Sequence, residues 1–290
     1  MGHNFAALPQ AARRGSRHVR HVIEIDGRPR DIDIRAMDES LIVWRKMFTA
    51  PLSPDNMETA DPEYLAAGHA DGRFKVFKEF FRKQIRVVGS CMVLAWDGDG
   101  VIGKMHFTTR EMHEAIGGPE CWHAPYCYCV DHDGFAPKLQ SFNDDELTRL
   151  LTSESRILRV LCFNIGHTDP RWHGQGIAKA MIEYLKQWAR ERGWKRIEAK
   201  SCPDITPTTI VGEWMLRRGT FERLGFSVLE QLQVSVEEAS RRLDEIEAFL
   251  AGNKDYPGCN EWYARNVDRL AVDPAWRTEY DRDYLMVCEL

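Results

Sequence analysis

The sequence predicts an α/β fold in which strands are mixed with helices. Apolar and polar residues alternate on both sides of Asp26-Gly27, which indicates a hairpin, or a lead-in strand followed by strand one. Two apolar runs flank the turn at 97–100 and indicate a second hairpin. The mostly apolar run at 155–167 is typical of a central strand, and a helix and a further strand follow it. Residues 157–202 are therefore predicted to form a β–α–β unit.

The composition limits the classes of protein to consider. The chain has 290 residues, 43% of them hydrophobic, which suits one elaborated domain or two small ones. A formal net charge of −5 gives no reason to expect a nucleic-acid partner. No window reaches the roughly 18 apolar residues of a membrane span. The eight cysteines, without a secretory signal, indicate reduced thiols in a cytoplasmic protein.

The first 20 residues differ in charge from the rest of the chain. They include four arginines and no acidic residue. A targeting peptide is one interpretation, but the segment lacks the long apolar region of a secretory signal. We expect a flexible, solvated tail over 1–20 and a single domain over 21–290.

The remaining elements are predicted from the spacing of apolar residues and from the positions of helix-breaking residues. Residues 41–48 look helical and end before two prolines, and phenylalanines spaced by three and four predict a helix over about 71–85. Towards the end of the chain we expect a helix over 207–224, a strand over 226–234, helices over 236–250 and 260–270, and a last strand over 283–290.

The helix of the β–α–β unit carries one apolar stripe. Ile177, Met181, Leu185 and Trp188 share a face, and the charged residues Lys179, Glu183, Lys186 and Arg190 are expected on other faces. Gly193 is placed to end the helix.

A glycine turn opens this helix and predicts an anion-binding site. The first N–H groups of a helix have no internal partner, and glycine lets the backbone approach an anion closely. The expected donors are the amides of Gly174, Gln175, Gly176, Ile177 and Ala178.

Three phosphate-binding loops are compared with this turn. A Walker A loop is excluded because Gly-Lys-Ser/Thr is missing, and the Rossmann pattern fits poorly because Lys179 takes the place of its third glycine. A pyrophosphate loop for coenzyme A is the third candidate, and a purely structural turn stays open.

At this point the sequence resembles the GNAT superfamily of acyl-CoA-dependent N-acyltransferases. The loop of that family reads Gln/Arg-x-x-Gly-x-Gly/Ala, and "DPRWHGQGIA" matches it except that His173 stands at the first position. "RLGFSVLEQ" resembles a later segment of the family, and "IDIRAMDES" resembles its first strand and turn. The resemblance covers roughly 30–110 and 155–232, and the last strand.

The resemblance implies a fold and a reaction. The fold is a mixed, mostly antiparallel central sheet flanked by helices, here with insertions at about 111–150 and 236–278. Acetyl-CoA would be the co-substrate. Its pyrophosphate would bind at His173 and the 174–178 turn, and its pantetheine near Gly166, His167 and Thr168, where the central strand splays from its neighbour. A primary amine of a small-molecule or peptide acceptor would attack the thioester directly.

Both proton-handling residues common in the family are missing. The central strand carries no carboxylate, and Arg159 lies near the position expected for one. The position of the usual tyrosine acid is Phe221, which cannot donate a proton. His167 is a substitute base or a hydrogen-bonded structural histidine. Cys202 is a substitute acid or a small buried hydrophobe.

The segment "CWHAPYCYCVDHDG" is the main unusual feature. We expect it to shape an acceptor pocket with Trp122, Tyr126 and Tyr128. Metal binding is the alternative, with five candidate ligands: Cys121, His123, Cys127, Cys129 and His132. Their irregular spacing argues against it.

Two rivals to an N-acetyltransferase follow from these departures. One is an acyl-CoA-binding protein without catalysis, and the other a metal- or redox-sensing protein on the same fold. The second insertion is expected to cover the sheet or to form a homodimer contact.

Overall fold

A computed structural model defines most of the predicted sheet and the helices around it. It describes residues 18–25, 27–39, 73–98, 100–117, 135–165, 170–172, 174–204, 216–236, 239 and 282–290. Residues 1–17 of the basic tail, the helix expected at 41–48 and nearly all of the second insertion lie outside these residues. Val19 and Arg20, which were expected in the tail, belong instead to β1. None of the described helices is both long and apolar enough to cross a membrane.

The described elements follow the predicted order. In chain order they are β1 (Val19–Ile25), β2 (Arg28–Ala36), α3 (Arg73–Val88), β3 (Met92–Asp97), β4 (Gly100–Thr109), α4 (Arg110–Gly117), α5 (Phe135–Ser141), α6 (Asp144–Thr152), β5 (Ile157–Ile165), the 3₁₀ turn η4 (Pro170–Trp172), α7 (Ile177–Glu191), β6 (Arg196–Cys202), β7 (Leu216–Arg217), α9 (Arg218–Arg223), β8 (Ser227–Gln233) and β9 (Arg282–Glu289).

The strands form one mixed, mostly antiparallel sheet. Its order is β1-β2-β3-β4-β5-β6-β9-β8, with β7 paired to β6 off this path. Only β5–β6 and β6–β7 are parallel. Both hairpins are confirmed, as is the β–α–β unit, in which α7 connects β5 to β6. The predicted fold class is therefore confirmed.

The two parallel central strands separate after a short paired stretch. Their register begins at Ile157↔Arg196 and ends at Val160↔Ala199, although β5 runs on to Ile165. The register between β4 and β5 shifts at the same level and skips Leu161, so β5 carries an extra residue where it leaves β6. Beyond this point β6 pairs with β7 instead. The sheet therefore forks between β5 and β6.

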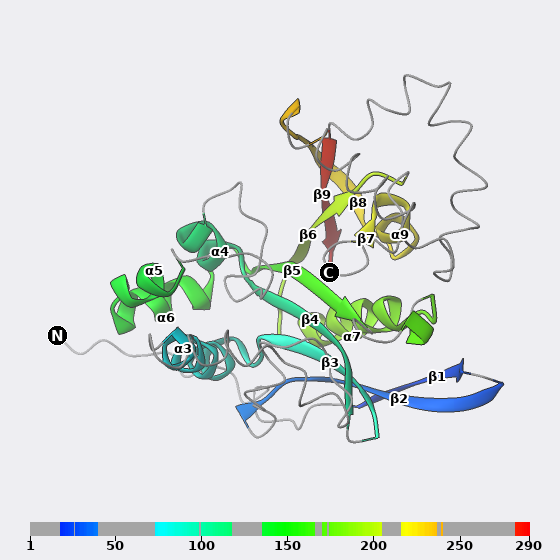
Figure 1. The fold of residues 1–290 in the computed structure, drawn as a ribbon. Helices are drawn as coiled ribbons and strands as arrows, with labels where there is room; N and C mark the ends of the chain where they lie inside the picture. The colour runs from blue at the N-terminus through cyan, green and yellow to red at the C-terminus, as the bar shows by residue number, and fades with distance from the viewer. Residues whose placement is uncertain are drawn as a thin grey trace.

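Helices pack on both faces of the sheet (Figure 1). Helices α3 to α6 contact one another on one face, where α4 and α6 contact β4. Helix α7 packs on the other face against β1 to β5, and α9 packs near the fork against β6 to β9. The Tyr184 hydroxyl of α7 accepts a hydrogen bond from Ala36 N at 2.9 Å, which attaches the helix to the end of β2.

The apolar stripe of α7 is buried as predicted. The exposed fractions of its four residues are at most 4%. One of the charged residues outside this stripe, Lys186, is also buried. Its ammonium donates to Leu224 O at 2.7 Å and pairs with Glu183 at 3.2 Å. It is buried because it satisfies a carbonyl at the C-terminal end of α9.

The helix expected over 207–224 is wrong at residues 216–217. Leu216 and Arg217 pair with Ser201 and Cys202 as β7, so α9 begins only at Arg218. The carboxylate of Asp204 accepts from Gly219 N at 2.8 Å and from Arg218 at 3.1 Å. The pairing of β7 with β6 and the capping of α9 by Asp204 outweigh the local preference of residues 216–217 for a helix.

The expected insertion at 111–150 is helical wherever it is described. Helix α4 follows β4 directly, and α5 and α6 come before β5. Asn143 and Glu146 form a capping box at the start of α6. The sequence analysis found no clear periodicity over 117–140 and predicted none of the three helices α4, α5 and α6.

Candidate functional site

The predicted anion-binding turn has the backbone conformation that glycine favours. Gly174 and Gly176 have φ angles of 73° and 77°, in the left-handed region. Gly176 is the N-cap of α7, and no side chain caps the helix there. The first amides of a 15-residue helix are thus left for another acceptor, and the helix dipole favours an anion.

A histidine from the first hairpin contacts this turn. The Nε2 atom of His21 in β1 lies 3.0 Å from Gln175 O, and a carbonyl can only accept, so Nε2 carries the proton. A Cβ added at Gly176 would lie 3.5 Å from the same nitrogen. His21 therefore orients the peptide that precedes the helix. No sequence signal pointed to it, because the two residues are 154 positions apart.

Replacing His21 by alanine is expected to weaken coenzyme A binding about two- to tenfold, since a net hydrogen bond is worth about 0.5–1.5 kcal/mol. The measurement is calorimetry with coenzyme A. His18→Ala is the matched control, because His18 lies one residue before the same strand, is itself exposed, and pairs with half-buried Asp33 at 3.1 Å. An equal loss of coenzyme A affinity in both variants would mean that the substitutions weaken binding by destabilising the hairpin, and not through the contact with the turn.

The residue expected at the position of the usual proton donor is part of an aromatic cluster. Phe221 in α9 is fully buried. Its ring centroid lies 6.3 Å from that of Phe163 in β5 and 4.9 Å from that of Phe226. Because Phe163 belongs to the part of β5 beyond the fork, Phe221 packs beside the gap between the central strands.

Phe221→Leu is expected to lower the free energy of unfolding by about 1 kcal/mol, through lost packing, and to change kcat by less than tenfold. A general acid typically contributes 10²–10⁴-fold, and phenylalanine has no proton to give. Phe221→Tyr should be tolerated. The tests are urea unfolding and single-turnover transfer to an amine found by screening. A hundredfold loss of kcat in Phe221→Leu with unchanged stability would contradict this placement.

Cys202, the other candidate acid, lies at the end of β6 and is buried. Its Sγ donates to Leu216 O at 3.7 Å, so the thiol helps to hold β7 against β6. A catalytic role for Cys202 stays a prediction.

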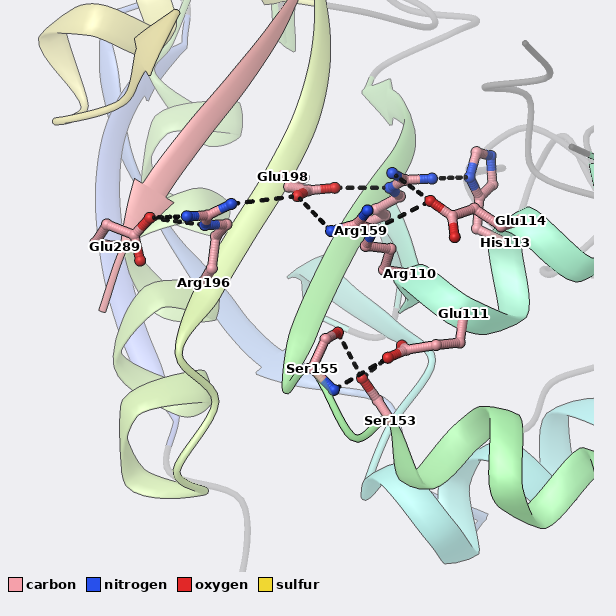
Figure 2. A network of polar contacts seen from close by, with 10 residues as sticks. All are labelled: Arg110, Glu111, His113, Glu114, Ser153, Ser155, Arg159, Arg196, Glu198 and Glu289. Atoms are coloured by element: carbon pink, nitrogen blue, oxygen red, sulfur yellow. Dashed lines mark hydrogen bonds and ion pairs between the residues drawn. The ribbon is translucent and has the colours of Figure 1, made fainter. Parts of the chain in front are cut away.

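A network of ion pairs crosses the paired part of the central strands (Figure 2). Arg159 of β5 lies opposite Glu198 of β6, and Arg159 Nε donates to Glu198 Oε2 at 2.8 Å. Both side chains are at most 6% exposed. Arg159 also contacts Glu114 at 3.0 Å and donates to His113 Nδ1 at 3.0 Å. The arginine at the position expected for a carboxylate thus holds a carboxylate of the next strand.

Further charges complete this network. Glu198 Oε1 lies 3.9 Å from Arg110 and 3.8 Å from Arg196. Arg196 in turn pairs with Glu289 of β9 at 2.6 Å. Three guanidinium groups therefore surround the carboxylate of Glu198 and hold it in place. The network joins α4, β5, β6 and β9 and has a structural role.

One more ionisable group lies on β4 next to the fork. His106 pairs in register with Cys162, directly beside the irregularity in β5. Burial, and secondarily the charge of Lys104, lower the pKa of His106 well below its usual range. A neutral imidazole that resists protonation is a weak general base.

Several predicted site residues lie outside the described part of the chain. They are Gly166, His167, Thr168 and His173 of the coenzyme segment, the pocket aromatics Trp122, Tyr126 and Tyr128, and the metal-ligand candidates Cys121, His123, Cys127, Cys129 and His132. Among the described residues, no group of three or more histidine, cysteine or acidic side chains is arranged to hold a metal ion.

The structure thus places a sheet that forks between parallel strands next to a helix opened by a glycine turn. The sequence model of the acetyltransferase (GNAT) family matches residues 167–209, which contain the turn, α7 and β6. Over this segment the chain is similar to the acetyltransferase (GNAT) family, in agreement with the resemblance seen in the sequence. No curated protein matches the sequence.

Solved structures of acetyltransferases resemble the fold. A candidate arylalkylamine N-acetyltransferase 7 of the yellow fever mosquito is 11% identical, with 95% of this chain and 94% of that chain covered and a TM-score of 0.43. The IAA acetyltransferase of Bacillus cereus is 9% identical, with 89% and 99% covered and a TM-score of 0.36. A GCN5-related N-acetyltransferase of Kribbella flavida is 12% identical, with 89% and 98% covered and a TM-score of 0.34. At scores this low, these likenesses carry no information about the acceptor.

Proposed function

We propose that the protein transfers an acetyl group from acetyl-CoA to a primary amine of a small-molecule or peptide acceptor. The observation that carries the proposal is the fork between β5 and β6 beside the open N-terminus of α7. The pyrophosphate would accept hydrogen bonds from the amides of the 174–178 turn. The pantetheine arm would run along β5 where that strand has no partner on the β6 side.

Catalysis in this proposal is mainly positioning. The acceptor nitrogen attacks the thioester carbon, the C–S bond breaks, and the ammonium proton is released. Of the family's two usual proton handlers, the acid position holds Phe221, and the charged group on the paired part of β5 is Arg159, engaged by Glu198. His167 remains our proposed base.

The test has two stages. Calorimetry with coenzyme A first measures binding, and acetyl-CoA turnover is then followed with a panel of small amines and peptides. Tight binding without turnover across the panel would favour the catalytically silent acyl-CoA-binding protein. Absence of coenzyme A binding would rule out both functions.

A further inference from the structure

Ser201 is a buried hydroxyl with no role in the interactions described above. Its exposed fraction is 0%, and Oγ has no hydrogen-bond partner among the residues that the structure describes. Burying a hydroxyl without a partner costs free energy, so nearly all such groups in folded proteins are paired. A bound ligand that accepts a hydrogen bond would satisfy this one.

Ser201 stands at the fork. It lies two residues beyond Ala199, the last residue of β6 that pairs with β5. Its backbone pairs with Leu216 of β7 on one side and Tyr284 of β9 on the other. The hydroxyl therefore lies where the central strands have separated, beside the gap along which the proposed function places the pantetheine arm of acyl-CoA.

The side chain of Ser201 is on the α9 face of the sheet. Residues directly opposite in an antiparallel pair share a face, so Ser201 lies beside Tyr284. The Tyr284 ring lies 5.0 Å from the guanidinium of Arg218 in α9. Phe221, on the same helix, takes the position of the usual proton donor and packs against Phe163 of β5. The hydroxyl therefore lies on the side where that donor would otherwise act.

We propose that Ser201 donates a hydrogen bond from its hydroxyl to the sulfur of bound coenzyme A and stabilises the leaving thiolate. This inference rests on the proposed function. The amine nitrogen bonds to the acyl carbon, the electron pair of the C–S bond stays on sulfur, and the ammonium proton goes to the base of the proposed function. Ser201 keeps its own proton throughout, since an alcohol is a far weaker acid than a thiol. Its contribution is a hydrogen bond to developing charge.

The test compares coenzyme A with desulfo-coenzyme A, which lacks the sulfur, in the wild type and in Ser201→Ala. Calorimetry is done at pH 7 and pH 9, because thiols titrate near about 8.5 and the thiolate accepts the stronger hydrogen bond. At pH 9 we expect the wild type to bind coenzyme A roughly tenfold more tightly than desulfo-coenzyme A, because a hydrogen bond to a charged group is worth about this much. At pH 7 the difference in affinity should be smaller. Ser201→Ala should lose this preference and bind desulfo-coenzyme A as the wild type does.

Two controls accompany this comparison. Ser227→Ala changes an exposed serine on β8 and should keep the preference. Ser201→Ala should melt at or above the wild-type Tm, because it removes an unpaired buried hydroxyl.

The outcomes separate the two proposals. Tight binding of coenzyme A with the same preference in the wild type and Ser201→Ala would overturn the role of Ser201 and leave the proposed function intact. Failure of the wild type to bind either ligand would overturn the coenzyme site, and the role of Ser201 with it.

Discussion

Gly176→Asp is expected to weaken coenzyme A binding at least tenfold, which corresponds to about 1.4 kcal/mol. The substitution places a negative charge at the N-terminus of α7, where the pyrophosphate would bind. It also puts a side chain at a φ of 77° and a Cβ 3.5 Å from His21 Nε2. The new carboxylate can attract the histidine away from Gln175. The measurement is calorimetry with coenzyme A.

Backbone strain alone must be separated from this effect. Gly27→Asp is the matched control, because Gly27 has a φ of 72° and nothing lies within 4 Å of an added Cβ. It should lose stability as Gly176→Asp does but bind coenzyme A normally. Gly176→Ala, which adds strain without charge, should fall between the two. If coenzyme A bound Gly176→Asp as tightly as the wild type, the turn would not be the pyrophosphate site.

Glu198→Ala is expected to cost about 3–5 kcal/mol of unfolding free energy, the usual effect of breaking a buried ion pair from one side. The variant leaves the guanidinium of Arg159 buried without its nearest carboxylate, which lies 2.8 Å away in the wild type. Glu114 still offers a carboxylate to Arg159, but its side chain is 38% exposed. Urea unfolding measures the loss.

The same network supplies the control for this prediction. Glu289 pairs with Arg196 at 2.6 Å, but its side chain is 64% exposed, so Glu289→Ala should cost less than about 1 kcal/mol. Replacing both buried partners, Arg159→Met with Glu198→Leu, should recover much of the stability. A loss below about 1 kcal/mol in Glu198→Ala would mean that the pair is not the central contact of this network.

Local pattern and turn chemistry account for what could be predicted. Both hairpins were predicted from alternation around Asp-Gly turns, and both formed in that place. The stripe on α7 was predicted from its spacing and is buried. The conformation of the 174–176 turn follows from its glycines and the helix behind it. Each of these signals lies within a few neighbouring residues, so the corresponding element can be predicted from a single sequence.

Errors arose where a distant segment overrode a local preference. Leu216 and Arg217 became a strand because β6 offered a free edge after the fork. Lys186, which the spacing placed off the apolar stripe, is buried because its ammonium donates to a carbonyl 38 positions away, and no local signal indicated this. Propensity is worth only fractions of a kcal/mol per residue, and a backbone pairing or a satisfied buried carbonyl exceeds it.

The sequence by itself determined the α/β class, the β–α–β unit and the glycine turn that opens α7, because their signals are local. Only the tertiary structure decided where β5 leaves β6, that His21 contacts Gln175, and that Arg159 is held by Glu198. These features join residues far apart in the chain, and neither periodicity nor composition specifies which distant partners meet. Pairing of strands and burial of charge are settled only when the whole sheet forms.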